Sequence, residues 1–168
     1  MNETIQSIKF GLALVMLTLI FGLSLGIFFG IAEDSVKSYI AEGIATHPEV
    51  HDKKSNSKIW RYAQRAHFHA TGIAAFSIGL VILTLFSSLS TSLKPKVSIL
   101  IGLGGLYPLS WFSMFLLAPS LGRRAAHSHI VTEACTYIGV LGLFLGITIL
   151  CANLFFDLLS DEKSLLDN

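Results

Sequence analysis

The sequence predicts an all-α integral membrane protein, a bundle of four transmembrane helices. Of its 168 residues, 52% are apolar and only 14% are charged, whereas an ordinary soluble domain has roughly 25% charged residues. The apolar residues lie in four long blocks that are almost free of charge. Each block reaches the length of about 20 residues that a helix needs to cross a bilayer. The predicted helices cover residues of about 10–31, 66–89, 97–118 and 128–156.

The segments outside the membrane are short, so we expect a single transmembrane domain over residues 1–168. The one substantial extramembrane loop covers residues 32–65 and contains a helix-compatible stretch at 35–44. Residues 119–126 are expected to form the connection between the third and fourth helices. The net charge of +1 gives no basis for a nucleic-acid partner, so the lipid bilayer is the partner that the composition predicts.

Glycines repeat every four residues on one face of the first predicted helix, at Gly22, Gly26 and Gly30. Such faces let helix backbones approach closely in lipid, where no hydrophobic effect draws helices together. Packing within the bundle is one interpretation. The alternatives are room for a flat cofactor, or a seam with a second copy or another membrane subunit.

Four of the six histidines occur in two copies of one motif, Ala-His-x-His preceded by arginine. The copies lie at Arg65–His69 and Arg124–His129, and His67 and His127 are 60 residues apart. We expect the motifs to open the second and fourth helices at the same membrane face. The repetition raises the hypothesis of two pseudo-repeated helical hairpins.

Helical geometry separates the two histidines of each motif, because residues two apart point about 200° from each other. On the fourth helix, His129 shares a polar face with Glu133, and a polar face in a membrane protein points inward. By equivalence of the motifs, His69 also points inward. His67 is then expected to pack against a neighbouring helix or to reach the lipid headgroups.

Glu133 is an acid that we expect about one turn inside the hydrocarbon, where an unpaired charge is costly. The expected partners are His129, His69 or an arginine that reaches inward. A simple hydrogen-bonded clasp between the second and fourth helices is the alternative to a functional role. Glu33, at the end of the first helix, is expected at the same membrane face.

The first functional hypothesis is a haem b or a transition metal held between the second and fourth helices, in a redox or electron-transfer subunit. The layout resembles membrane-bound b-type cytochromes, which also use histidines from different helices. It departs from them because no histidine lies deep within a helix. The residues expected to bind a haem are His69, His129, Arg65 and Arg124. The residues expected to bind a metal ion are His69, His129, Glu133, His67, His127 and Glu33.

Two other hypotheses remain open: a proton or ion relay in a small transporter, and an accessory or assembly subunit that binds no ligand. The sequence has no Gly-x-Ser-x-Gly and no His-Glu-x-x-His, so the isolated chain is not expected to be an enzyme. We expect a bacterial inner-membrane protein. Most lysines and arginines lie in the loops on the histidine side, which predicts that this side is cytoplasmic.

Overall fold

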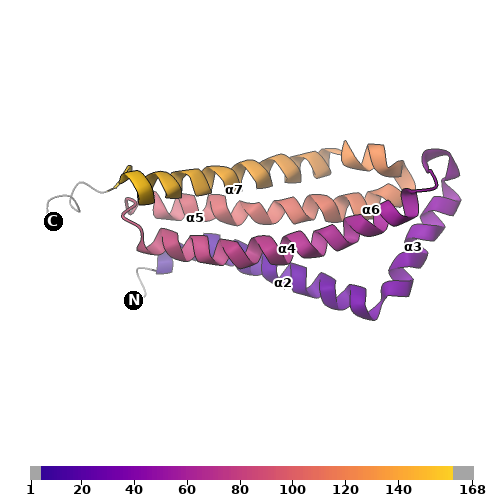
Figure 1. Cartoon of the computed structure of the whole chain (residues 1–168), viewed down its shortest axis with the longest axis horizontal. Helices are drawn as coiled ribbons and strands as arrows, with labels where there is room; N and C mark the ends of the chain where they lie inside the picture. Colours follow the sequence, from indigo (N-terminus) through magenta and orange to yellow (C-terminus); the bar gives the residue numbers. More distant parts are fainter. Residues whose placement is uncertain (1–4, 161–168) are drawn as a thin grey trace.

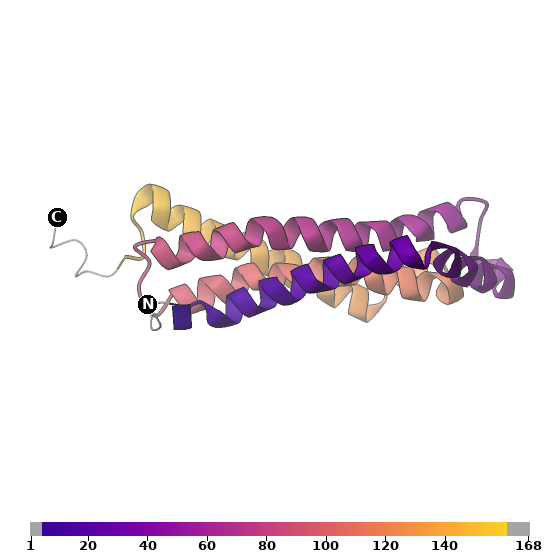
Figure 2. The same ribbon diagram turned by 90° about the horizontal axis from the view of Figure 1, so that it is seen from below.

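The computed structural model describes residues 5–160 and has four long helical segments that lie side by side (Figures 1 and 2). The first is α2 (Lys9–Ile31), the second is α4 (Ser55–Phe86) and the fourth is α7 (Ile130–Phe156). The third consists of α5 (Lys94–Gly102), a 3₁₀ turn η2 (Leu103–Gly105) and α6 (Leu106–His127). All four are long and apolar enough to span a membrane, which confirms the predicted fold class.

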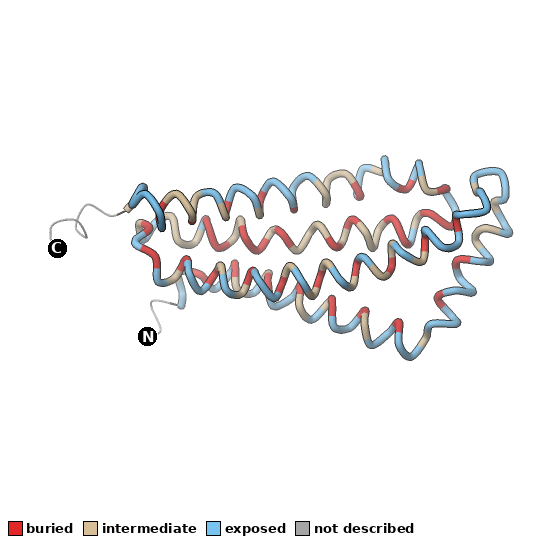
Figure 3. Tube along the Cα trace, in the orientation of Figure 1, coloured by how far each residue is buried: buried red, intermediate tan, exposed pale blue. Residues whose placement is uncertain are grey.

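The helices form a bundle in which α6 lies between α4 and α7 (Figure 1). α2 packs on α4 and α5, α4 packs on α6, and α6 packs on α7. In the described part of the chain, α4 and α7 have little or no contact with each other. Buried residues recur along the side of each helix that faces its neighbours (Figure 3). Many of the exposed residues are large and apolar, as lipid contact requires.

The glycines of α2 and α7 bring helices together within the bundle. A Cβ added at Gly22 would lie 2.8 Å from the backbone nitrogen of Thr71 in α4, and one at Gly26 would meet the His67 ring. An interface with a second copy or another subunit was predicted at Gly22, Gly26 and Gly30. That prediction is wrong for Gly22 and Gly26, because α4 already occupies the space beside them. Only Gly30 has open space beside it.

The second helix begins well before the predicted residue 66, at Ser55. Its start is held by Asp52, whose carboxylate accepts hydrogen bonds from the Lys54 backbone N–H at 2.9 Å and from the Ser55 hydroxyl at 3.1 Å. The Ser55 hydroxyl accepts in turn from the Asp52 N–H at 3.0 Å. This reciprocal pairing satisfies groups that a helix start leaves free, so a polar segment that hydropathy assigns to a loop continues the helix outside the lipid.

The third predicted connection, residues 119–126, is helical rather than a loop. α6 runs through Pro119 to His127 and changes direction at Gly122, whose φ is +78°. Glycine adopts this left-handed conformation without steric cost. The chain between α6 and α7 is reduced to Ser128 and His129, so the two basic residues that follow Gly122, Arg123 and Arg124, are held on helical backbone.

A short helix, α3 (Glu33–Thr46), crosses the end of the bundle opposite to the chain termini (Figure 1). The Tyr39 hydroxyl donates to the Leu116 carbonyl of α6 at 2.7 Å, and Gly43 packs directly on Pro119. After the 3₁₀ turn η1 (Pro48–Val50), His51 Nε2 donates to the Pro119 carbonyl at 2.9 Å. These contacts fasten residues 33–52 to the end of α6.

Candidate functional site

The two Ala-His-x-His motifs have different local structures. The first lies inside α4, one helical turn or more from its start, whereas the second spans the end of α6 and the start of α7. Equivalent sequence therefore does not give equivalent side-chain directions, and the argument that places His69 by analogy with His129 is wrong.

His67 joins α4 to α2. Its Nδ1 donates to the Gly22 carbonyl at 2.8 Å, and its ring lies against Gly26. The prediction that His67 packs against a neighbouring helix is confirmed. A cavity beside the ring is also lined by Glu33, whose carboxylate pairs with Lys37 at 2.6 Å.

His69 faces α6 rather than α7. Its ring stacks on Trp111, with centroids 5.8 Å apart and planes at 27°, and it contacts Tyr107 at 5.1 Å. The ring is half-buried between α4 and these two aromatic side chains of α6. His69 is therefore turned into the bundle, toward α6 and not toward α7, which begins directly after His129.

His129 and Glu133 lie at the start of α7. His129 is the N-cap residue, and its Nδ1 accepts a hydrogen bond from the Val131 N–H at 3.3 Å. Glu133 falls in the first turn, where the positive end of the helix dipole favours an acid. Within residues 5–160 the Glu133 carboxylate has no hydrogen-bond or ion-pair partner, so the predicted pairing with His129, His69 or an arginine is wrong. His127 and Arg124 are both exposed.

These positions do not converge on one ligand. Among the described residues, no group of three or more histidine, cysteine, aspartate or glutamate side chains is arranged to hold a metal ion. His69 lies in α4, whereas His129 is the N-cap of α7, and α4 and α7 each pack on α6 rather than on each other. The geometry therefore gives no support to a metal ion or haem shared between α4 and α7, and that hypothesis stays a prediction.

The structure instead gathers basic side chains into one cavity at the α3 end of the bundle, which we call the basic cavity. Its volume is about 170 Å³. It is lined by Lys58, Arg61, Tyr62, Arg65 and Arg123. Three of these side chains follow one another at three- and four-residue spacing along α4, and none of the described acidic residues lines the cavity.

Two of the guanidinium groups are held by specific contacts. Arg65 lies over the ring of Trp111, with Cζ 4.6 Å from the centroid, a favourable cation–π geometry. Arg123 Nη2 contacts Asp52 Oδ2 at 2.7 Å. Loss of hydration would raise the pKa of Asp52, but hydrogen bonds from Ser55 and the Lys54 N–H, together with the charge of Arg123, lower it overall. Asp52 is the one carboxylate paired with a base of the basic cavity in the described chain.

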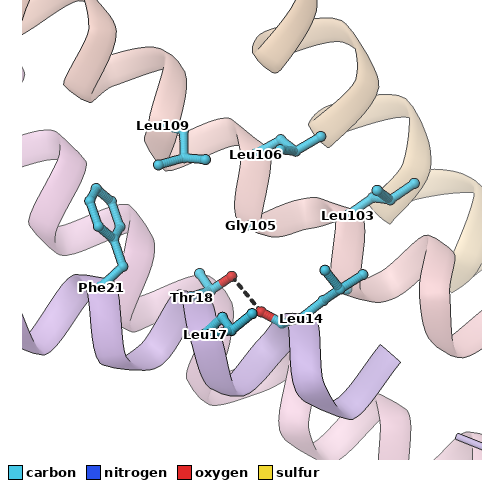
Figure 4. Close-up of a pocket in the computed structure, with 9 residues that line it drawn as sticks. Leu14, Leu17, Thr18, Phe21, Leu103, Gly105, Leu106 and Leu109 are labelled. Atoms are coloured by element: carbon cyan, nitrogen blue, oxygen red, sulfur yellow. Dashed lines mark hydrogen bonds between the residues drawn. The ribbon is translucent and has the colours of Figure 1, made fainter. Parts of the chain in front are cut away.

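Apolar cavities also flank the bundle, and two of them are lined by its long helical segments alone. One of about 290 Å³ lies between α2 and the start of α6, where the Thr18 hydroxyl is already bonded to the Leu14 carbonyl at 2.9 Å (Figure 4). The other, of about 250 Å³, has walls from α4 and α7 and includes Ile73, Tyr107 and Val140. We call the second one the α4–α7 groove. Tyr107 belongs both to this groove and to the ring contact with His69.

The prediction of site residues identified Arg65 but missed most of the basic cavity. Lys58, Arg61 and Tyr62 were assigned to a loop, and in a loop the spacing of residues does not predict which side chains lie on the same face. Read as a helix, the positions 58, 61, 62 and 65 fall on one face. That spacing is the signal in the sequence that identifies them.

Comparisons of the chain with protein-family models, with curated proteins and with solved structures found no match. The function is therefore argued from the cavities and side chains alone.

Proposed function

We propose that this multi-pass membrane protein binds a phosphate-type anion in the basic cavity, at the end of the bundle that carries the histidines. The observation that carries the proposal is a cavity lined by four basic side chains and a tyrosine, with no acid in its lining. Arginine presents a planar fork of donors that matches the oxygens of a phosphate.

The electrostatics of the cavity support an anion rather than a structural role. Bases that share a cavity repel one another, and among residues 5–160 only Arg123 has a carboxylate beside it. An anion would relieve the repulsion among Lys58, Arg61 and Arg65. Such an interaction is stronger at the membrane interface than in bulk water, because the effective dielectric constant is lower there.

The location also suits this function. α4 continues from the apolar segment into the polar segment that begins at Ser55, so the basic cavity lies where lipid headgroups meet water. Lysine and arginine at this depth attract anionic headgroups and soluble anions alike. The shared chemistry is a phosphate group, from either source.

The test is thermal stability of the purified full chain in a nonionic detergent, at constant ionic strength, as inorganic phosphate is added. At a phosphate concentration of 100 times Kd, we expect the folded state to gain about 2.7 kcal/mol. The double variant Lys58→Gln/Arg61→Gln should lose this gain. The matched double variant Lys53→Gln/Lys54→Gln removes two exposed bases at the same membrane face and should keep it. Equal stabilisation of both double variants, or none of the native chain, would refute the proposal.

The redox, relay and accessory functions predicted from the sequence stay as separate proposals, and no contact in the described chain favours them over anion binding. Their sharpest test is an optical spectrum with elemental analysis of the purified protein. A Soret band or stoichiometric metal that is lost in both His69→Ala and His129→Ala would support the redox proposal.

A further inference from the structure

We infer that the anion is the headgroup of an anionic phospholipid whose acyl chain lies in the α4–α7 groove. This inference rests on the proposed anion site and adds the chemical class of the ligand. Two features support it: a series of ring contacts links the basic cavity to the groove, and the groove opens to lipid.

A chain of aromatic contacts connects the basic cavity to the α4–α7 groove. Tyr62 of the basic cavity lies 5.8 Å from Trp111, and Arg65 lies over the same ring at 4.6 Å. Trp111 contacts His69 and Tyr107, with centroids 5.8 Å and 6.2 Å apart. Because Tyr107 lines the groove, charged, aromatic and apolar surfaces follow one another along the same side of the bundle.

The distances match an amphiphile. Arg65 and Ile73 are eight residues apart on α4, which corresponds to about 12 Å along the helix axis. A phosphate beside Arg65 therefore leaves the glycerol and first methylene groups of a phospholipid at the depth of the aromatic rings. The rest of the acyl chain reaches the apolar lining around Ile73.

The groove exists because α4 and α7 do not pack on each other, and α6 forms its floor. Its α7 wall includes Val140 and Phe144, which are 44% and 71% exposed. In a bilayer these side chains meet hydrocarbon, so an acyl chain can enter from the side without crossing the protein. The basic cavity then favours lipids with an anionic headgroup over neutral ones.

The experiment compares two ligands and two tryptophan variants of the full chain. Thermal stabilisation is measured in phosphatidylcholine nanodiscs with a rising fraction of phosphatidylglycerol, and separately with inorganic phosphate. Val140→Trp fills the groove, and Leu141→Trp adds the same ring at a neighbouring position that is 66% exposed and outside the groove lining.

We expect Val140→Trp to lower the affinity for phosphatidylglycerol, read from the lipid fraction that gives half of the maximal stabilisation, by about tenfold or more. This is the change expected when about two methylene groups lose their burial. Leu141→Trp should leave this affinity unchanged, and neither variant should alter the response to inorganic phosphate. Equal responses of both variants to phosphatidylglycerol would overturn the inference, and so would an inorganic phosphate response as strong as that to the lipid. In both cases the anion site itself would stand. A native chain that responds to neither ligand would refute both.

Discussion

Replacement of Gly22 by alanine tests the close contact between α2 and α4 on which the bundle depends. The new Cβ would lie 2.8 Å from the Thr71 backbone nitrogen and 2.9 Å from the Ala70 Cβ. Neither atom can rotate away, because one belongs to the backbone and the other is fixed to it. Ordinary contact begins at about 3.5 Å, so α2 has to move away from α4 by roughly 0.6 Å or more.

The cost has two parts. Overpacking of this kind typically costs about 1–3 kcal/mol. The same displacement lengthens the 2.8 Å hydrogen bond from His67 to the Gly22 carbonyl, and a buried hydrogen bond contributes about 0.5–1.5 kcal/mol. The matched control is Gly30→Ala, on the same helix with no atom within 4 Å. Both variants gain the helix propensity of alanine, so their difference reports the contact alone.

We expect Gly22→Ala to be less stable than Gly30→Ala by about 1.5–4.5 kcal/mol. The measurement is the apparent Tm of each variant in the same detergent, followed by size-exclusion chromatography after heating. For a chain of this length, each kcal/mol corresponds to roughly 2–4 °C. Identical Tm values for the two variants would show that α2 and α4 are not in contact at Gly22, and the helix arrangement described above would be wrong.

Three further predictions follow from the described contacts. The pKa of Asp52 is lowered in the folded chain, so its interactions with Arg123 and the start of α4 are present at neutral pH and are lost as the pH falls through that value, below the usual 3.8. The protection of the backbone amides of residues 47–54 against hydrogen exchange should therefore fall at acidic pH in the native chain but not in Asp52→Asn, and an equal loss of protection in both would contradict this. Asn153 is fully buried and donates to the Leu158 carbonyl at 2.7 Å, so Asn153→Leu should lower stability by about 1–3 kcal/mol; an unchanged Tm would count against the contact. Because His69 stacks on Trp111, His69→Ala should change the tryptophan fluorescence while His127→Ala, an exposed position, should not, and equal spectra would contradict the stacking.

The fold class was predictable because it depends on block hydropathy, a property of many residues at once. A span of some twenty uncharged residues has no soluble alternative, so errors at single positions do not change the outcome. The fourth helix starts within two residues of its predicted position. The glycine spacing on α2 also had a structural meaning, although the partner is α4 of the same chain and not a second copy.

The break in the third helix shows what local sequence signals add. Proline has no backbone N–H and its ring crowds the preceding turn, and Pro108 is the third residue of α6. The turn before it, Leu103–Gly105, narrows to 3₁₀ geometry. The position of this break can be predicted from the sequence, because Pro108 marks it. The direction in which α6 continues cannot, because it depends on packing against α4 and α7.

The relative positions of His69 and His129 were not predictable, because two kinds of information are needed that a single sequence lacks. One was which helices are neighbours: His69 and His129 were paired on the assumption that the second and fourth helices pack together, whereas α6 separates them. The other was local structure, since one copy of the motif is helical and the other contains the N-cap of α7. A repeated motif predicts equivalent geometry only where the backbone is also equivalent.

The error in the start of the second helix and the omission of the basic cavity have one physical cause. Hydropathy locates the part of a helix that lipid surrounds. It does not detect a polar extension of that helix, such as the one whose start is stabilised by the hydrogen bonds between Asp52 and Ser55. The extension is where a membrane protein can arrange charges on a rigid scaffold at headgroup depth. Along α4 it places Lys58, Arg61 and Arg65 on one face, and Arg123 of α6 joins them directly after the change of direction at Gly122. A site for an anion at the membrane surface is therefore expected where a spanning helix outruns its apolar segment, and basic residues at three- and four-residue spacing directly before such a segment are the pattern that predicts it.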